Sequence, residues 1–407
     1  MRVWKFLTII LAMALVMSAC NNDNDSNNEK NSSKDKKTSQ SSKDTYSKID
    51  YPKDGVKGIY VAPGATSNEQ FDELVKFIND TELNAMVIDV KDDEGNITMD
   101  LKSDNKLIRS NTLDRIDAKK IIKEMEKNDI YPIARIVTFK DSKLSNQRPD
   151  WSFKTSEGNV WENEGGDSFT NPFNVNVWDY NLNVAKEAAK AGFKEIQFDY
   201  VRFPEGFENK DQSLQYSSGK YEESGLNKVE QRVDTITEFL KSARKDLKSY
   251  DVQTSADVFG YAATVKETPG IGQSFPKIAK NVDVISSMIY PSHWNPGDFG
   301  LENPDREPYK TIDRYLDKEK EALKGIDSQK VKSRPWLQDF TASYLGEGRY
   351  KVYDKDEVTA QIQALKDHGI DEFLLWDASG NYTKGADYSP EKYSNPNAKQ
   401  HDHKKDK

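Results

Sequence analysis

The segment EIQFDYVRFP, residues 195–204, decides how the whole chain is interpreted. Its apolar and aromatic residues are typical of a strand buried in a protein core. An aspartate, Asp199, lies near its end, and an arginine, Arg202, follows three residues later. Charged side chains are seldom fully buried unless they are paired. We therefore predict a core strand whose carboxyl end contributes charged groups to a functional site.

Seven other segments of the same kind precede and follow this one. Each is a short run rich in β-branched and aromatic residues, the composition that favours strands. In chain order the eight predicted strands are residues 58–63, 85–91, 131–139, 195–203, 252–261, 282–290, 333–340 and 372–378.

Segments between most of these strands carry apolar residues at three- and four-residue spacing, which predicts amphipathic helices. Strands that alternate with helices imply a parallel sheet, and eight of them match a single α/β domain, the (β/α)8 TIM barrel. The alternative is an open, doubly wound sheet. That fold is expected to have a glycine-rich phosphate turn after an early strand, and GIYVAPGATSNEQF contains no GxGxxG. The predicted helices are residues 69–80, 117–128, 178–192, 232–249 and 356–369.

The longest connection follows the third predicted strand and covers residues 140–177. A loop of this length in a compact domain is usually either functional or disordered. This one contains Trp151 and Trp161, with Trp178 just beyond it, and aromatic residues argue against disorder. We expect one barrel domain over residues 51–393, with no second domain.

The N-terminus has the features of a secretion signal. Arg2 and Lys5 are followed by a short apolar run and then by Met17-Ser18-Ala19-Cys20, which resembles a bacterial lipobox. We predict that residues 1–20 are a lipoprotein signal peptide and that a lipid on Cys20 anchors the chain to the extracytoplasmic face of the cell membrane. The alternative is a simple cleaved signal peptide. The polar segments 21–50 and 394–407 are expected to be a disordered tether and tail.

The amino-acid composition argues against a nucleic-acid partner and against disulfide bonds. The 407 residues include 59 Lys and Arg and 68 Asp and Glu, which gives a formal net charge of −9. No basic stripe interleaved with aromatic residues is present, so we expect no nucleic-acid partner. Cys20 is the only cysteine, which excludes an intrachain disulfide.

Polar and aromatic residues gather at the carboxyl ends of the predicted strands. In a TIM barrel these ends form the active-site face, and alternate residues point into the lumen. The residues concerned, in strand order from the second strand onward, are Asp89, Asp92 and Asp93; Arg135; Gln197, Asp199 and Arg202; Ser255 and Asp257; Tyr290, His293 and Trp294; Trp336, Gln338 and Asp339; and Trp376 and Asp377.

This set of residues favours some reactions over others. Only His293 and His368 lie outside the tail, so Ser-His catalysis and a histidine-rich zinc site are poorly supported. A magnesium or manganese site built from carboxylates remains an alternative, because Asp199 and Asp257 lie on neighbouring strands. Two carboxyl groups alone can hydrolyse a glycosidic bond, one as acid and the other as nucleophile or base. We therefore expect glycoside hydrolysis with no cofactor and no metal.

Several blocks together resemble a known family. GIYVAPGATSNEQFDELVKFINDTELNAMVIDVKDDEGNI, EIQFDYVRFPEG, SADVFGY, MIYPSHW and FLLWDASGNY are similar to the bacterial glycoside hydrolase family known as DUF4015. The resemblance covers residues 55–388, and FDYVRFP is its most specific block. It implies a barrel distantly related to the α-amylases and a glycan as substrate.

The comparison with the amylases implies roles for two residues. Asp199 would be the nucleophile or charge stabiliser, and Asp257 the general acid/base. The amylase pattern has glutamate on the fifth strand and an arginine two residues before the nucleophile, whereas this chain has Asp257, and Arg202 follows Asp199. The partner of Asp199 could therefore instead be Asp89, Glu205 or Asp339. Arg202 is expected to hold a neighbouring carboxylate in its charged form.

The other strand-end residues are predicted to contact the glycan. These substrate-binding candidates are Asp89, Arg135, Gln197, Arg202, Tyr290, His293, Trp336, Gln338, Trp376 and Asp377. The chain is thus predicted to be a surface-anchored glycoside hydrolase that acts on a polysaccharide or cell-envelope glycan. Two alternatives remain: a carbohydrate-binding lipoprotein that uses the same cleft without turnover, and a carboxylate-bound metal enzyme.

Overall fold

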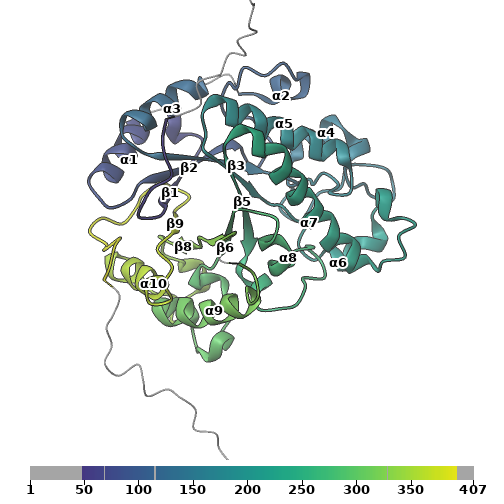
Figure 1. Ribbon diagram of the computed structural model, residues 1–407. Helices are drawn as coiled ribbons and strands as arrows, with labels where there is room; N and C mark the ends of the chain where they lie inside the picture. Colours follow the sequence, from purple (N-terminus) through teal and green to yellow (C-terminus); the bar gives the residue numbers. More distant parts are fainter. Residues whose placement is uncertain (1–47, 68, 114–115, 328, 392–407) are drawn as a thin grey trace, which may run out of the picture. The chain divides into compact units, whose positions relative to one another are not determined.

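The computed structural model describes residues 48–67, 69–113, 116–327 and 329–391. In this part of the chain nine strand segments form one parallel sheet that closes on itself, because β1 pairs with both β2 and β9 while β5 pairs with both β4 and β6. Figure 1 shows the strands around a centre and the helices outside them. The predicted (β/α)8 TIM barrel is confirmed.

The strands follow one another around the barrel in sequence order. They are β1 (Lys57–Val61), β2 (Ala85–Lys91), β3 (Tyr131–Val137), β4 (Glu195–Asp199), β5 (Gln253–Phe259), β6 (Val284–Met288), β7 (Lys332–Ser333), β8 (Trp336–Gln338) and β9 (Phe373–Trp376).

Two of these segments, β7 and β8, together occupy one position of the barrel, which reduces nine segments to eight strand positions. Both pair with β6, and only Arg334 and Pro335 separate them. Proline has no backbone N–H to donate to a neighbouring strand, so it interrupts the ladder. The carbonyl oxygen of Pro335 still accepts a hydrogen bond from the Leu374 amide at 2.9 Å, which keeps the path continuous.

The helices cover the outside of the barrel. Several have sequence-encoded ends: the longest, α7, begins with a capping box of Asn227 and Glu230, and α5 ends at Gly192, whose φ of 118° suits a residue without a Cβ. The helices are α1 (Glu69–Asn79), α2 (Lys106–Asn111), α3 (Ala118–Lys127), α4 (Ser142–Gln147), α5 (Val175–Ala191), α6 (Phe207–Lys210), α7 (Lys228–Leu247), α8 (Phe275–Ala279), α9 (Pro308–Ala322) and α10 (Lys355–Asp367).

Alternate strand residues belong to two separate apolar layers. In β2, Met86 and Ile88 pack with the helices in the larger cluster, whereas Ala85 and Val87 belong to a smaller cluster with side chains such as Trp336. The period of two along a strand explains this division. Asp89 continues the series of Ala85 and Val87, so the same alternation that fills the lumen with apolar side chains places a carboxylate near its carboxyl end.

The predicted strand bounds agree with the structure to within a few residues, with one informative exception. The fourth strand was expected to continue to Phe203, but β4 ends at Asp199. The next residue, Tyr200, has a φ of 45°, which is incompatible with an extended strand. The chain turns there, directly after the candidate nucleophile.

The long connection after β3 is ordered and lies against the barrel. It contains α4 and a short 3-10 helix, Pro149–Trp151. Its tryptophans serve packing: Trp151 lies 3.7 Å from the Arg148 guanidinium and Trp161 packs on Phe169. Neither lines the pocket at the barrel mouth.

Several predictions concern residues outside those that the structure describes. The signal peptide, Cys20, nearly all of the 21–50 tether and the 394–407 tail belong to this group, and they stay predictions. Of the helices that are described, none combines the length and the apolar character that crossing a bilayer requires.

Candidate active site

A pocket of about 320 Å³ lies at the carboxyl ends of the strands. This is the end of a TIM barrel where active sites are built. Eight of the predicted site residues line the pocket: Arg135, Asp199, Arg202, Asp257, Tyr290, His293, Trp336 and Trp376. The remaining lining residues are Asp93, Tyr200, Glu205, Phe259, Met288 and Phe340.

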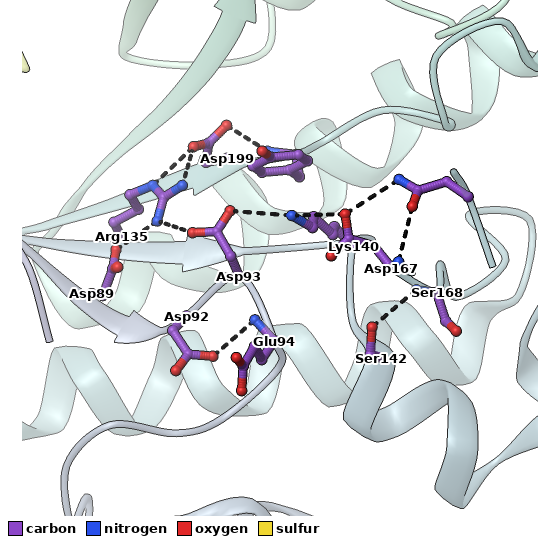
Figure 2. A network of polar contacts seen from close by, with 12 residues as sticks. Asp89, Asp92, Asp93, Glu94, Arg135, Lys140, Ser142, Asp167, Ser168 and Asp199 are labelled. Atoms are coloured by element: carbon purple, nitrogen blue, oxygen red, sulfur yellow. Dashed lines mark hydrogen bonds and ion pairs between the residues drawn. The ribbon is translucent and has the colours of Figure 1, made fainter. Parts of the chain in front are cut away.

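Arg135 on β3 holds Asp199 on β4. Its Nε and Nη2 atoms lie 2.8 Å and 2.6 Å from Asp199 Oδ2, a geometry in which one carboxylate oxygen accepts from both arms of the guanidinium. The Tyr200 amide donates to Asp199 Oδ1 at 2.6 Å. Figure 2 shows Arg135 between Asp199 and two further carboxylates, Asp89 and Asp93. These contacts give both oxygen atoms of Asp199 a hydrogen-bond donor and fix the orientation of the carboxylate.

Three carboxylates keep Arg135 itself charged. Burial alone would lower the pKa of Arg135, but Asp89, Asp199 and Asp93 together raise it well above its usual value. Asp89 lies 2.7 Å from Arg135 and also accepts a hydrogen bond from the Tyr60 hydroxyl at 2.7 Å. Because Asp89 is fully buried, its pKa is raised to about 6. Asp89 does not line the pocket; it supports Arg135 from beneath.

Asp257 on β5 has the opposite environment. Its side chain is buried, and the Trp336 indole Nε1 donates to its Oδ1 at 2.8 Å. Burial first, and the nearby charge of Asp199 second, raise its pKa well above that of an ordinary carboxyl group. The hydrogen bond from Trp336 and the charge of Arg135 act in the other direction but are too weak to offset this. Asp257 therefore favours its protonated form, beside a carboxylate that is paired with Arg135.

Arg202 does not contact Asp199, although its position at the end of the same predicted strand suggested support for the nucleophile. Its guanidinium lies 4.7 Å from the ring centres of both Tyr200 and Phe259. Its Nη2 pairs with Glu205 at 3.0 Å. The arginine that holds the candidate nucleophile is thus Arg135, which comes from the neighbouring strand.

Tyr200 is a pocket residue that the sequence interpretation missed. Its positive φ is uncommon for a bulky residue and costs free energy. The turn places its ring at the pocket, between Arg202 and Lys140, whose Nζ lies 5.1 Å from the ring centre. The apolar run continues past the turn to Phe203, which is why the strand was predicted to continue, although the alternation of apolar residues changes phase between Tyr200 and Val201.

Aromatic side chains form the rest of the pocket wall. Trp376 stacks on Tyr60 with ring centres 4.1 Å apart and meets Trp336 edge-on at 5.6 Å. Tyr290 contacts His293 edge-on at 4.8 Å. Desolvation by its surroundings lowers the pKa of His293, which favours the neutral imidazole at neutral pH. Rings of this kind suit the apolar faces of sugars.

Phe259 and Phe340 were also missed, and here the sequence did contain a signal. Each lies two residues after a predicted site residue, Asp257 and Gln338, and therefore on the same face of its predicted strand, 252–261 or 333–340. Met288 carries the same signal, because it lies two residues before Tyr290 in the predicted strand 282–290.

Four predicted substrate-binding residues lie outside the pocket lining. Gln338 accepts from the Ser292 amide at 3.0 Å and so braces the loop that carries His293. Asp377 accepts from the amide of Ser379 at 2.7 Å, as a turn residue. Gln197 is fully buried, and neither polar atom of its side chain has a hydrogen-bond partner among the residues described. The fourth of these residues is Asp89, which pairs with Arg135.

The three alternative partners for Asp199 do not combine the position and the environment that a proton donor needs. Asp339 pairs with Thr383 outside the pocket, and burial raises its pKa to about 6. Glu205 lines the pocket but is exposed and paired with Arg202. Asp89 lies beneath Arg135. Asp257 lines the pocket and is buried, and its pKa is strongly raised, so it is the best placed of the candidate acids.

The arrangement supplies two carboxyl groups in different environments, Asp199 beside Arg135 and Asp257 beside Trp336. In the described part of the chain, no group of three or more His, Cys, Asp and Glu side chains is placed to hold a metal ion. Two titratable groups with divergent environments are what acid and base catalysis requires.

Comparison with known proteins places the chain in a family. A family described as "Putative glycosyl hydrolase domain" (DUF4015) matches residues 58–382. No curated protein matches the chain. A hypothetical protein from Ruminiclostridium thermocellum is 32% identical over 49% of this chain and 97% of that chain, with a TM-score of 0.42.

Two solved glycosidase structures have a similar fold. The PgaB (BpsB) glycoside hydrolase domain from Bordetella bronchiseptica is 14% identical, with coverage of 80% of this chain and 95% of that chain and a TM-score of 0.56. A β-galactosidase from Marinomonas ef1 is 10% identical over 79% of this chain and 54% of that chain, with a TM-score of 0.50. Since the family match spans most of the chain, the protein belongs to the DUF4015 family of glycosyl hydrolase domains and is a glycoside hydrolase by class.

Proposed function

We propose that the protein hydrolyses glycosidic bonds in a polysaccharide or cell-envelope glycan by a two-carboxylate mechanism. In this mechanism Asp257 is the proton donor and Asp199 the charged carboxylate. One observation supports the proposal above all: two neighbouring aspartates share a pocket, Arg135 pairs with Asp199, and burial raises the pKa of Asp257 well above its usual value. Glycosidases require this division of roles between two carboxyl groups.

The geometry suggests what each group does. The proton on Asp257 passes to the glycosidic oxygen, so that the leaving sugar departs as an alcohol. Asp199, held by two nitrogen atoms of Arg135, attacks the anomeric carbon or takes a proton from the attacking water. If Asp199 attacks the anomeric carbon, a water then cleaves the glycosyl–Asp199 ester and gives its proton to Asp257, which restores both carboxyl groups. If Asp199 instead takes a proton from the attacking water, it releases that proton to solvent, and Asp257 takes up a proton from solvent. Trp336 fixes the orientation of Asp257 throughout, because its indole N–H donates to the same carboxyl group.

The test is release of reducing ends from a panel of glycans by the chain from Asn21 to Lys407. Asp199→Asn and Asp257→Asn are each expected to reduce kcat by at least about 100-fold, the scale of losing a general acid. Asp339→Asn is the matched control, since it removes a buried carboxylate whose pKa is also raised but which lies outside the pocket. Full activity of both pocket variants on a glycan that the wild type cleaves would disprove the assignment.

A second function, carbohydrate binding without turnover, is favoured by one feature. Asp257 occupies the position where the amylase-like pattern has the longer glutamate. A shorter acid could leave the proton out of reach of the glycosidic oxygen. Calorimetric binding of a glycan with no product after prolonged incubation would identify this case, and Asp257→Glu would then be expected to introduce cleavage.

We also propose that a lipid on Cys20 anchors the enzyme at the extracytoplasmic face of the membrane. The support is the order of basic residues, short apolar run and small residues before the only cysteine. The full chain with Cys20→Ser, expressed in a lipoprotein-processing bacterium, should move from the membrane fraction to the soluble fraction. Equal membrane retention of the variant and wild type would contradict the anchor.

A further inference from the structure

Exposed aromatic rings occur at only one face of the described chain. Tyr261 and Tyr344 are 40% and 68% exposed, and every other Phe, Tyr and Trp in this part of the chain is at least partly buried. Tyr261 lies in the 3-10 helix Gly260–Ala263 after β5, and Tyr344 in the 3-10 helix Ser343–Leu345 after β8. Both therefore follow the carboxyl ends of barrel strands, where the pocket opens.

Tyr261 extends a stack that begins inside the pocket. Its ring centre lies 5.8 Å from that of Phe259, at an interplanar angle of 31°. The other neighbour of Phe259 is the Arg202 guanidinium, which in turn lies over Tyr200. Tyr200, Arg202 and Phe259 line the pocket, so Tyr261 continues its wall outward.

Tyr344 is attached to the pocket from the other direction. Its hydroxyl donates to Ser292 Oγ at 3.1 Å. Ser292 belongs to the 3-10 helix Pro291–His293 after β6, whose last residue, His293, lines the pocket and is exposed. The hydrogen bond fixes the ring of Tyr344 beside His293.

The order of the strands relates these residues to one another. β6 pairs with β5 and with β8, so the loop of His293 lies between the loops of Tyr261 and Tyr344. Three neighbouring loops thus present an exposed ring each. We name Tyr261, His293 and Tyr344 the rim arc.

We propose that the rim arc is a glycan-binding track, and hence that the substrate is a polysaccharide chain extending beyond the pocket. This inference rests on the proposed function for the identity of the ligand. The pocket, at about 320 Å³, is at the small end of the range for ligand sites and can enclose only a short piece of such a chain. Sugars outside it need platforms on the rim.

The chemistry of the rim arc fits a glycan. A sugar has an apolar C–H face and a ring of hydroxyl groups, so it needs an aromatic surface with polar groups at the edge. The Tyr344 hydroxyl, held by the buried Ser292, lies at the edge of its exposed ring, and the charges of Arg202 and Glu205 act on Tyr261. Each exposed tyrosine therefore combines both requirements.

The experiment measures binding as a function of glycan length. A disaccharide and a hexasaccharide of the chito-, cello- and malto-series are titrated calorimetrically into the wild type and Asp199→Asn. We expect the hexasaccharide of one series to bind more tightly than its disaccharide. Tyr261→Ala and Tyr344→Ala should each weaken hexasaccharide binding about tenfold, as the loss of an aromatic platform can, and leave disaccharide binding unchanged. Tyr261→Phe and Tyr344→Phe should retain most of the affinity.

Val175→Ala is the control, because it removes an exposed apolar side chain at the start of α5 that belongs neither to the pocket at the barrel mouth nor to the rim arc. Three results would overturn the inference. The alanine variants could lose equal affinity for both saccharide lengths, they could lose none, or the wild type could show no preference for the longer saccharide in any series. A protein that binds by length through Tyr261 and Tyr344 but releases no product would contradict the proposed hydrolysis alone.

Discussion

At the scale of single residues, Asp199 and Asp257 differ because of what surrounds them and not because of what they are. Two nitrogen atoms of Arg135 and one backbone amide face Asp199. Asp257 has one neutral donor, Trp336, and is fully desolvated beside the charge of Asp199. Desolvation penalises the charged form, and opposite charges favour it. The same side chain can therefore serve as acid at one position and as carboxylate at the other.

The hydrogen bond from Trp336 provides a test of the acid. It stabilises the charged form of Asp257 and so lowers its pKa; Trp336→Phe removes it, and the pKa should rise further. Because the acid must be protonated to act, the alkaline limb of the kcat profile should move up by about 0.7 pH units, the equivalent of a hydrogen bond of about 1 kcal/mol. Trp376→Phe, which does not contact Asp257, should leave the limb in place. A downward shift in Trp336→Phe would contradict the role of Asp257.

The raised pKa of Asp257 also has a consequence for stability. Between the unfolded and the folded pKa the folded protein holds a proton that the unfolded chain has released, so stability falls as the pH rises. Asp257→Asn keeps an acceptor for Trp336 and removes this cost. It should raise the free energy of unfolding at pH 7 by about 1–2 kcal/mol, the usual gain of a stabilising substitution, with a smaller gain at pH 4. Urea unfolding at both pH values measures this difference in the free energy of unfolding. A less stable Asp257→Asn variant at pH 7 would show that the folded protein compensates the negative charge of Asp257.

At the scale of elements, the end of β4 shapes the site. A strand that continued to Phe203 would keep alternating its side chains, but the chain turns at Tyr200. The turn directs the Tyr200 amide to the Asp199 carboxylate and places the ring between two cations. Strained backbone at functional sites is tolerated when the surrounding structure fixes it.

Glycine usually destabilises a protein relative to alanine, but the positive φ of Tyr200 predicts the opposite order at this position. Glycine adopts positive φ without steric cost, whereas alanine does not. Tyr200→Gly should therefore be more stable than Tyr200→Ala by about 1 kcal/mol, the cost of the left-handed conformation for a residue with a Cβ. Chemical denaturation of the two variants gives this difference directly. If Tyr200→Ala were at least as stable as Tyr200→Gly, the backbone at residue 200 would have left its positive φ in the variant. Both variants should lose affinity for the glycan, because both lack the ring.

At the scale of the whole molecule, a buried ionic network closes the barrel at the end opposite the pocket. Arg334, between β7 and β8, donates to Glu195 at the start of β4 at 2.7 Å and to Glu372, just before β9, at 2.9 Å. The Tyr51 hydroxyl accepts from Arg334 and donates to Glu372. Burial would raise the pKa of Glu372, but Arg334 and Tyr51 lower it overall. The network joins three strands and the segment before β1.

Loss of Arg334 should therefore destabilise the fold far more than loss of a surface cation. Arg334→Met leaves Glu195 buried without its partner, which costs about 4 kcal/mol. Arg148→Met, which removes a partly exposed pair with Asp150, should cost less than about 1 kcal/mol. Denaturant unfolding compares the two. Similar small losses in both variants would show that the base of the barrel has a different source of stability.

Much of the fold follows from local sequence. The eight strand positions follow from runs of β-branched residues, and β2 has the predicted bounds of 85–91. The position of Asp199 and Asp257 at the mouth also follows, because parallel strands in a barrel end at one face. Phe259 could have been added by the same rule of alternation.

The sequence by itself determined the barrel, its active face and the family, because strand period, helix period and short motifs are local properties of the chain. Only the tertiary structure decided that Arg135 rather than Arg202 holds Asp199, and that Asp89 lies beneath the pocket. It also decided the turn at Tyr200 and the burial that separates Asp257 from Asp199. These depend on side chains from different strands meeting in one desolvated space, and the electrostatic energy of such a meeting is set by distance and burial, which no local pattern contains.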